Sequence, residues 1–513
     1  MAQPLEGEPL REISPDEFVE RRGAHLYLAG RVFRFAGCNM YWLGLDENVG
    51  GIAFPSQFRI DDALMTAKEM HLTVVRAHTI GISVGRPESF QPAPGRFEHD
   101  NLKAADYAIH RARELGIRLV VPLTDRWNYY HGGIHTFANW RNVTADAFYT
   151  NDTVIEDFKT YISELLNHVN PHTGMAWKDD STIMCWETGN ELSPPVAWTN
   201  TIAQHIKTIA PRQLVMDGRW GVDEGIFSSP HVDIVSSHYY VYPFLELWMD
   251  LRRAARRASE AGKVFVVGEY DWIGYPFGAS VNLIPFLSLI ERSENVAGSL
   301  FWSLFPHRDD SGFVYHRDHV LSYTLHYPGP SASMRQRTQI IRHHAARMRG
   351  FSSPLPHGVP PPPHITAVTS DTVRWCGSVG AAAYEVQMSL AITGPWRNIT
   401  ANAQRQQAER LRLPPLLSIS NWTGSPLPPP TDHSLPFPQA PFFVRLVADN
   451  AWRKWPVSGV GASLWAHLCD TMRADEQRRD ERGEVAFMRV RGVNLAGVAG
   501  EWSEPASIRC TRE

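Results

Sequence analysis

The chain has 513 residues, of which 43% are hydrophobic and 20% are charged. This is the composition of a globular protein, and the length exceeds what one ordinary core requires, so we expect two or more domains. The 50 basic and 54 acidic residues give a net charge of −4, which gives the chain no electrostatic preference for nucleic acid or for an anionic membrane. We expect neither as a partner, and we expect a monomer.

The N-terminal segment Met1–Glu8 has no basic region and no apolar region, so it does not resemble a signal peptide. No stretch of the chain reaches the ~18 apolar residues that a membrane span requires. The chain is therefore expected to stay inside the cell, unless a leader has been removed. Four Asn-x-Ser/Thr triplets fit the second alternative, at Asn142, Asn151, Asn398 and Asn421.

Eight short apolar runs alternate with longer amphipathic segments in the first 304 residues. The runs lack polar alternation, as expected for parallel strands that are covered on both faces. They are Val32–Phe35, Thr73–Arg76, Arg118–Pro122, Ile183–Glu187, Leu214–Asp217, Val232–Ser236, Val264–Gly268 and Gly298–Trp302.

Helical patterns fill several gaps between these runs, at Ile60–Met70, Asn101–Leu115 and Ile155–Val169. Eight such units over roughly 300 residues predict a (β/α)8 TIM barrel. An open doubly wound sheet is the alternative. It usually needs fewer strands, and no Gly-rich phosphate-binding turn follows the first run.

A proline-rich segment at 351–363 separates two kinds of pattern. A proline run is stiff and extended and continues neither a helix nor a sheet. After it, apolar residues alternate with polar ones, for example at Ala383–Met388 and Ala486–Val493. We predict a barrel domain over residues 1–350, a linker over 351–363 and a smaller antiparallel β-sandwich over 364–513. Two segments interrupt the sandwich pattern, a proline-rich one at 425–441 and a charged one at 473–484.

Two apolar runs end on a glutamate. Ile183–Leu192 contains Glu191, and Lys263–Tyr270 contains Glu269. A carboxylate beside a buried strand costs free energy unless it is paired or used, and barrel enzymes place their chemistry at these strand ends. A lone glutamate more often caps a helix or pairs with an arginine. Two of them are what acid-catalysed cleavage of a glycoside requires.

We assign Glu191 as the acid/base and Glu269 as the nucleophile. The two roles need different pKa values, with the acid protonated and the nucleophile ionised. Arg76 and Tyr240 are expected to keep Glu269 ionised. If the enzyme retains the anomeric configuration, the two carboxyl groups should lie about 5–5.5 Å apart.

The other strand ends supply further polar and aromatic candidates. Asp217 is either a base or a partner of the nearby Arg219, and Glu187 is expected to point into the lower barrel layer, outside the catalytic set. We expect no metal, no cofactor and no serine triad. The candidates for contacting substrate are Arg76, Asn190, His238, Tyr240, Trp302, Trp127, Asn128 and Trp42.

Together these residues resemble glycoside hydrolase family 5, and within it the β-mannanase branch. The resemblance covers about residues 30–305. It rests on Gly37–Trp42, Arg76, Trp127-Asn128, Gly132-Gly133, Phe148–Asn151, Val169–Gly174, Lys178–Glu187, Asn190-Glu191, His238, Tyr240, Glu269 and Trp302. The chain departs from the pattern of the branch at Thr188-Gly189, Leu192-Ser193, His78 and His131. The tail resembles a fibronectin type III module through its Arg-Val-x-Gly-Val-Asn-x-Ala-Gly motif.

The resemblance implies a retaining glycosidase that needs no cofactor, with β-1,4-mannan or manno-oligosaccharides as substrate. An exo-acting β-mannosidase and a β-glucanase on the same barrel are the alternatives. A carbohydrate-binding protein without activity is a third, which the presence of both glutamates disfavours.

Overall fold

The computed structural model describes residues 10–48, 50–240, 244–275, 277–316, 322–368, 372–389, 391–398, 443–445 and 484–510. The chain divides into two compact units, which are described separately. The first holds the chain up to Pro306 together with Tyr315–Leu325 and Gln336–Leu355. The second holds His307–Val314, His326–Arg335 and the chain from Pro356 onward.

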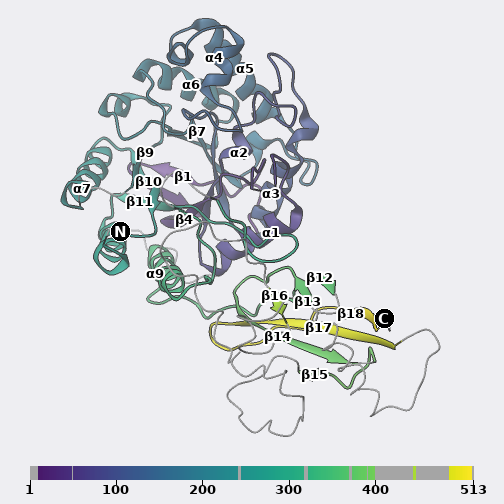
Figure 1. Ribbon diagram of the computed structural model, residues 1–513. Coiled ribbons are helices and arrows are strands. Elements are labelled where there is room, and N and C mark those ends of the chain that lie inside the picture. Colours follow the sequence, from purple (N-terminus) through teal and green to yellow (C-terminus); the bar gives the residue numbers. More distant parts are fainter. Residues whose placement is uncertain are drawn as a thin grey trace. The chain divides into compact units, whose positions relative to one another are not determined.

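The first unit is built around a closed barrel of eight parallel strands (Figure 1). Around the barrel the order is β10-β11-β4-β5-β6-β7-β8-β9, so each strand pairs with its neighbour in sequence and β11 closes onto β4. The strands are β4 (Phe35–Asn39), β5 (Val74–Arg76), β6 (Arg118–Pro122), β7 (Ile183–Glu187), β8 (Leu214–Asp217), β9 (Ile234–Tyr239), β10 (Val264–Asp271) and β11 (Val296–Trp302).

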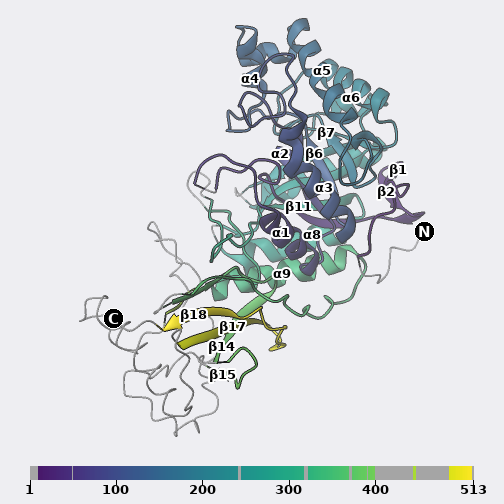
Figure 2. The same cartoon turned by 90° about the vertical axis from the view of Figure 1, so that its right-hand side faces the viewer.

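Helices follow the strands around the barrel (Figure 2). Asn151 caps α5 by accepting a hydrogen bond from the backbone of Thr153, and Gly116 in the left-handed region ends α3. The α-helices are α1 (Gln57–Glu69), α2 (His78–Gly81), α3 (Lys103–Leu115), α4 (Ile134–Trp140), α5 (Asp152–Asn167), α6 (Val196–Ile209), α7 (Phe244–Glu260), α8 (Ile284–Arg292) and α9 (Ala332–Met348). Single turns of other helix types are η1 (His99–Leu102), η2 (Ala145–Tyr149), η3 (Trp177–Asp179), η4 (Glu224–Ser228) and η5 (Ala279–Leu283).

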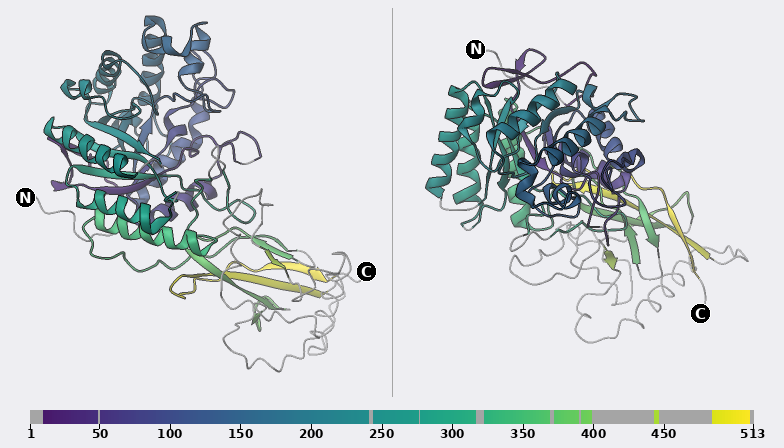
Figure 3. Two further views of the ribbon diagram at one scale, coloured as in Figure 1. Left: turned by 60° about the vertical axis from the view of Figure 1, so that its left-hand side comes forward. Right: turned by 90° about the horizontal axis from the view of Figure 1, so that it is seen from above.

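A three-stranded antiparallel sheet precedes the barrel, with β1 (Glu20–Arg22), β2 (His25–Leu28) and β3 (Arg31–Val32). Leu26 of this sheet and the flanking residues Val19 and Phe33 belong to the same buried cluster as residues of the barrel interior, such as Val74 and Val264. The sheet therefore covers the amino-terminal end of the barrel. The right-hand view of Figure 3 shows this hairpin near the N label.

The predicted (β/α)8 fold is confirmed, and the closed barrel excludes the open doubly wound sheet. The first predicted strand, Val32–Phe35, is wrong. Arg31–Val32 belongs to the covering sheet, whereas the barrel strand Phe35–Asn39 has the small residues Ala36, Gly37 and Cys38 at its centre. The sixth strand begins two residues later than predicted and continues through polar residues to Tyr239.

The second unit contains two antiparallel sheets, ordered β12-β13-β16 and β15-β14-β17-β18. One buried cluster joins side chains from both sheets, including Trp375 of the first and Val386 and Val490 of the second. The strands are β12 (Ile365–Val368), β13 (Thr372–Trp375), β14 (Ala381–Ser389), β15 (Arg397–Asn398), β16 (Phe443–Arg445), β17 (Glu484–Asn494) and β18 (Ala506–Cys510). The predicted interruptions at 425–441 and 473–483 lie outside the described residues.

The proline-rich segment at 351–363 forms neither helix nor strand. Its later part is packed rather than exposed, because Pro360 and Pro363 are buried and Asn494 donates a side-chain hydrogen bond of 2.8 Å to the carbonyl oxygen of Gly358. From Pro356 onward it belongs to the second unit. In the described part of the chain, none of the helices is both long and apolar enough to cross a membrane.

Candidate active site

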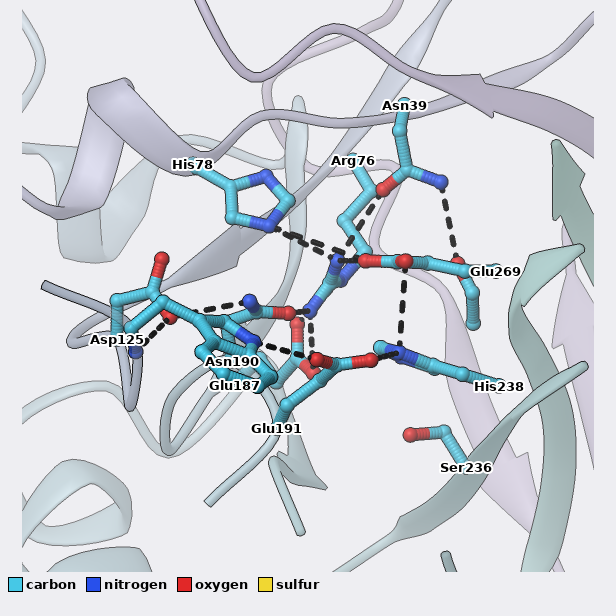
Figure 4. Close-up of polar contacts among 12 residues, drawn as sticks. Asn39, Arg76, His78, Asp125, Glu187, Asn190, Glu191, Ser236, His238 and Glu269 are labelled. Carbon is cyan, nitrogen blue, oxygen red and sulfur yellow. Dashed lines mark hydrogen bonds and ion pairs between the residues drawn. The ribbon is translucent and has the colours of Figure 1, made fainter. Parts of the chain in front are cut away.

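A cluster of buried polar side chains occupies the carboxyl-terminal ends of the barrel strands (Figure 4). Its members come from β4, β5, β7, β9 and β10 and from the loop after β7, so residues far apart in the sequence meet at one point. Such a cluster is costly unless its charges and hydrogen-bonding groups satisfy one another. The members are Asn39, Arg76, Glu187, Asn190, Glu191, His238 and Glu269.

Arg76 is the hub of this cluster, and it is fully buried. Its guanidinium donates two hydrogen bonds to Glu187, of 2.6 and 3.0 Å, and one of 2.8 Å to Glu269. Further bonds reach the amide oxygens of Asn190 at 2.8 Å and Asn39 at 3.1 Å. The planar fork of an arginine suits this arrangement, because it holds two carboxylates and two amides in fixed directions.

Glu187 therefore belongs to the site, although the sequence argument left it out of the catalytic set. Its two carboxylate oxygens accept from Nε and one Nη of Arg76, and burial raises its pKa while Arg76 lowers it. Its contact with the hub makes it a positioning residue, since it orients the arginine that holds Glu269. The sequence showed that Glu187 ends an apolar run, but it did not show that its side chain contacts Arg76 on β5.

Glu269 receives hydrogen bonds from two sides. Arg76 donates to one carboxylate oxygen and the Tyr240 hydroxyl donates to the other, so both predicted supports of this residue reach it. Burial nevertheless raises the pKa of Glu269 to about 7, against the lowering effects of His238, Arg76 and Tyr240. The carboxylate can be ionised at neutral pH only because these donors are present.

Glu191 lies beside Glu269 and has a different environment. Its backbone has a φ of 52°, in the left-handed region that costs free energy for a residue with a side chain. His238 Nδ1 lies 2.7 Å from one carboxylate oxygen, and the Trp127 indole N–H donates a bond of 2.6 Å to the other. Burial raises the pKa of Glu191, but the bonds from His238 and Trp127 outweigh it, so the net shift is downward.

This order of pKa values is the reverse of the predicted one in the substrate-free site. The sequence argument expected a protonated Glu191 and an ionised Glu269. The structure lowers the pKa of Glu191 and raises that of Glu269, because Glu269 is more deeply buried and His238 bonds to Glu191 rather than to Glu269. His238 Nδ1 is also 3.5 Å from Glu269, so its imidazole lies between the two carboxylates.

Asn190 is held in place by Asp125, a residue that was not among the predicted site residues. Its amide donates a bond of 3.1 Å to Asp125, which is buried and also lies 2.9 Å from His131. Asp125 further accepts from the backbone of Trp127 at 2.9 Å. One carboxylate thus fixes both Asn190 and the start of the Trp127 loop. The acid that follows the third apolar run could have suggested it.

The departures from the family pattern after β7 have a packing explanation. The Thr188 hydroxyl accepts a bond of 2.9 Å from the backbone of Gly218. A Cβ atom at Gly218 would lie 1.8 Å from the carbonyl oxygen of Gly189, so the two loops touch backbone to backbone. Thr188-Gly189 therefore packs closely against the loop after β8, and this contact fixes the segment that carries Glu191.

Aromatic side chains border the cluster on two sides. Trp302 is half-buried and stacks on Tyr41 with ring centroids 5.6 Å apart. On the Glu191 side, Trp127 is 42% exposed and meets Trp220, which is 49% exposed, at 6.0 Å. Trp220 was not among the predicted residues, and its place directly after the fifth strand end is the signal that could have found it. These exposed rings can offer flat apolar faces to sugar rings.

Two predicted substrate residues do not join the cluster. Trp42 is wrong, because its side chain is fully buried, with Arg59 over its ring and its indole N–H donating to the carbonyl oxygen of Leu304. The loop after β4 turns this ring into the core, which periodicity could not show. Asn128 is exposed in the Trp127 loop, and none of its described contacts is with the two glutamates.

Three of the cluster residues have atoms close enough to share a cation. Within the described residues, ligand atoms of Glu191, His238 and Glu269 lie within 4.8 Å of one another. The same atoms are already joined by hydrogen bonds to one another, to Trp127 and to Tyr240. The geometry thus has an explanation without a metal, and the expectation that none is required stays a prediction.

Comparisons with known proteins concern the barrel part of the chain. A family model described as "GH family 5 beta-mannosidase-like" matches residues 16–250. A putative mannan endo-1,4-beta-mannosidase 5 of Oryza sativa subsp. japonica is 27% identical over 404 residues, which cover 65% of this chain and 77% of the relative. Mannan endo-1,4-beta-mannosidase 2 of the same organism is 34% identical, over 40% of this chain. The chain spans only 48% of that relative, and about half of several other plant relatives.

Solved structures give the same result for the fold. The hyperthermostable endo-1,4-beta-D-mannanase from Thermotoga petrophila RKU-1 is 25% identical, with a TM-score of 0.53, over 61% of this chain and 99% of its own. The glycoside hydrolase family 5 mannosidase from Rhizomucor miehei is 20% identical, with a TM-score of 0.54, over 66% of this chain and 98% of its own. The second likeness supports the fold alone.

Proposed function

We propose that this chain is a glycoside hydrolase of the family 5 mannosidase group and that it hydrolyses β-1,4-mannosidic bonds in mannan or manno-oligosaccharides, as its similarity to that group supports. The reaction we propose retains the anomeric configuration and proceeds by two displacements on two glutamates. The observation that carries this proposal is the closeness of Glu191 and Glu269. One carboxylate oxygen of Glu191 and one of Glu269 lie within 4.8 Å of each other. Retaining enzymes hold their carboxyl groups about 5–5.5 Å apart, whereas inverting enzymes need about 6.5–9.5 Å.

In the first displacement, Glu269 attacks the anomeric carbon while Glu191 gives its proton to the departing glycosidic oxygen. A covalent glycosyl–enzyme ester forms and the sugar–oxygen bond breaks. Arg76 and Tyr240 stabilise the negative charge of Glu269 before the attack. In the second displacement, Glu191 takes a proton from water, and the resulting hydroxide attacks the same carbon and releases Glu269.

Three neighbours complete the proposed chemistry. Asn190, held between Arg76 and Asp125, is placed to bond the sugar 2-hydroxyl, a contact that strengthens in the transition state. His238 bonds Glu191 and can hold the proton that this residue must donate. Trp302 supplies a ring face for the sugar that is attacked, and Trp127 lies on the leaving-group side because it bonds the acid/base.

The experiment that tests the function combines a substrate panel with two matched variants. Purified protein is incubated with mannan, a glucan and aryl β-mannoside, and the products are separated by chromatography. Glu269→Gln and Glu191→Gln should each reduce turnover of mannan by at least about a thousandfold, given the usual size of such losses. Glu224→Gln changes an exposed glutamate that pairs with Arg257, so it serves as the folded control.

Product sizes and stereochemistry decide the finer points. Mixed short manno-oligosaccharides indicate endo action, mannose alone indicates an exo-mannosidase, and release from the glucan instead would overturn the mannan assignment. Proton NMR of the first product should show the β-anomer. An α-anomer, or more than about a thousandth of the wild-type rate in Glu269→Gln, would overturn the double displacement.

For the rest of the chain the proposal follows the sequence. We propose a barrel domain over 1–350, a linker over 351–363 and a fibronectin type III-like sandwich over 364–513. The two antiparallel sheets with a shared core support the sandwich. A monomer whose partner is a polysaccharide or oligosaccharide, without nucleic acid or membrane, is the assembly we propose. Size-exclusion chromatography with light scattering tests it.

A further inference from the structure

An exposed cation lies on the leaving-group side of the proposed site. Arg126 is in the loop after β6, directly before Trp127, and its side chain is exposed. The Trp127 indole bonds Glu191, which gives its proton to the departing oxygen. The side chains around Trp127 therefore border the part of the substrate that departs.

The backbone of this region is fixed by hydrogen bonds between three loops. The N–H of Arg126 donates a bond of 3.1 Å to the carbonyl oxygen of Asn190. The N–H of Trp220 donates a bond of 2.9 Å to the carbonyl oxygen of Leu192. The segments that carry Arg126, Glu191 and Trp220 thus lie side by side, so a ligand here meets side chains on a rigid backbone.

The guanidinium of Arg126 makes few contacts with the protein. Its Nη1 donates a bond of 3.1 Å to Ser193 Oγ, and its central carbon lies 5.8 Å from the centroid of the Trp127 ring. Ser193 is one of the positions at which the chain departs from the β-mannanase pattern. Among the residues that the structure describes, no carboxylate forms an ion pair with Arg126. The guanidinium has more N–H donors than these contacts use.

The neighbouring Arg219 differs, because it has an acid of its own. It pairs with Asp223 at 3.6 Å. Burial raises the pKa of the Tyr149 hydroxyl, and the charges of Arg126 and Arg219 lower it, so both cations lie near this hydroxyl. The exposed Asp146 acts on the hydroxyl in the opposite sense, without pairing with Arg126 in the described part of the chain. Of the two cations, Arg126 is the one left available to a ligand.

Two exposed aromatic rings lie beside this cation. Trp127 and Trp220 meet edge to face, with an angle of 64° between their planes. A bare anion would use neither ring, and a neutral sugar would leave the cation without a partner. A sugar that carries a negative charge uses both features, since its ring stacks on an indole while the charge reaches the guanidinium.

On the basis of the proposed function, we propose that the leaving-group side accepts a sugar unit that carries a carboxylate, as a uronic acid does, and that Arg126 binds this carboxylate. The planar fork of a guanidinium matches a carboxylate with two parallel hydrogen bonds. The bond that is cleaved and the roles of Glu191 and Glu269 stay the same. The substrates then include β-mannosides that are joined to an acidic unit.

The test compares two aryl β-mannosides that differ in one charge. The leaving group of para-carboxyphenyl β-mannoside carries a carboxylate, and that of para-carbamoylphenyl β-mannoside carries the neutral amide of the same shape. The measured quantity is kcat/KM for the acid divided by kcat/KM for the amide. The leaving groups differ in intrinsic reactivity, but this difference is the same for every variant and cancels when the ratios are compared.

Variants locate the charge recognition. Arg126→Gln should lower this ratio about fivefold or more, the upper end for an ion pair at an exposed site. Arg126→Lys keeps the charge but loses the fork and should give an intermediate ratio. Arg219→Gln changes the neighbouring arginine that already has an acid, and should leave the ratio unchanged. Added NaCl should lower the ratio in the wild type but not in Arg126→Gln, which a purely structural role of Arg126 would not produce.

Binding is also measured apart from turnover. In the Glu269→Gln background, titration calorimetry should show tighter binding of the acid than of the amide, and adding Arg126→Gln should remove the difference. If neither mannoside is hydrolysed by the wild type, the proposed function fails, and these affinities still decide the role of Arg126.

Two results would overturn the proposal. The first is a fall of equal size with both mannosides in Arg126→Gln, which would show that Arg126 acts on packing or on neutral hydroxyl groups. The second is a lower ratio in Arg219→Gln with no change in Arg126→Gln, which would place the carboxylate elsewhere.

Discussion

Replacing Tyr240 by phenylalanine tests whether the Tyr240 hydroxyl keeps the nucleophile ionised. The side chain donates one hydrogen bond to Glu269, and the pKa of Glu269 is already raised to about 7 by burial. A hydrogen bond to a charged group is worth about 1.5–3 kcal/mol, which corresponds to about 1–2 pKa units. Tyr240→Phe should therefore raise the pKa of Glu269 into the range of about 8 to 9.

The loss of rate in Tyr240→Phe relative to the wild type should be large at low pH and should disappear at high pH. Below the pKa the reaction depends on the small ionised fraction of Glu269, so kcat/KM of the variant at pH 5 should fall about 10- to 100-fold relative to the wild type. Above pH 9 both proteins have an ionised Glu269, and the ratio should return toward one. The assay is the pH profile of kcat/KM on an aryl β-mannoside between pH 5 and 9.5.

The neighbouring residue provides the matched control. Tyr239 is also buried, but its hydroxyl donates to Asp250 on α7, on the other side of β9. Tyr239→Phe should give a variant-to-wild-type ratio that does not change with pH. A loss of equal size at every pH in Tyr240→Phe would refute the reasoning, because it would show that Tyr240 acts on binding or geometry and not on ionisation.

Three other substitutions test separate parts of the site. Burial raises the pKa of Asp217 from 3.8 to about 7. Between these two pH values the folded chain keeps a proton that the unfolded chain loses, so stability falls as the pH rises from about 4 to about 7. Asp217→Asn should remove this fall, so above pH 8 its free energy of unfolding in denaturant titrations should be about 3–4 kcal/mol higher than that of the wild type. The variant should retain activity, and a large loss of activity would show that Asp217 acts as a base. Trp127→Phe removes a donor to Glu191 and raises its pKa, so the ratio of variant to wild-type kcat/KM should rise about tenfold as the pH increases through the lowered pKa of Glu191, mostly below about pH 5. A flat ratio would contradict this. Gly218→Ala places a methyl group against a backbone oxygen and should lower the unfolding midpoint by about 5–10 °C in calorimetry, and an unchanged midpoint would disprove the close packing.

The strands of the barrel could be predicted from the sequence because their apolar runs contain little else. Seven of the eight predicted runs overlap the observed barrel strands in most of their residues, and the exception, Val32–Phe35, lies where the covering sheet passes into the barrel. The covering sheet itself was not predicted. Its strands are only two to four residues long, too short for a periodic pattern to develop.

The site was predicted by a rule of the fold, since residues that end parallel strands meet at one edge of a barrel. This rule brings Arg76, His238 and Glu269 together without any knowledge of distances. It cannot say which partner each side chain chooses. Glu187 was assigned to the lower layer, yet it reaches Arg76 on the second strand, a contact between residues 111 positions apart. Trp42 was predicted to lie at the sugar-binding surface. This prediction failed because the conformation of a loop, which the sequence does not show, decides where the ring points.

The charge balance of the cluster explains why this order of pKa values is compatible with the proposed mechanism. Three carboxyl groups, those of Glu187, Glu191 and Glu269, face one permanent cation, Arg76, and one imidazole, His238. If all three were ionised, even a protonated His238 would leave one excess negative charge in a buried site, which burial strongly disfavours. Burial raises the pKa of both Glu187 and Glu269, and the value of about 7 for Glu269 means that this carboxyl group carries a proton in about half of the free enzyme at pH 7.

The proposed reaction needs a proton on Glu191. His238 lies 2.7 Å from Glu191 and 3.5 Å from Glu269, so the proton can move between the carboxyl groups without leaving the cluster. A bound sugar favours the move, because the positive charge that develops at the anomeric carbon stabilises an ionised Glu269, and the glycosidic oxygen gives Glu191 a proton acceptor. In the proposed mechanism, substrate binding therefore shifts a proton from Glu269 to Glu191, and the two carboxyl groups act as one coupled pair.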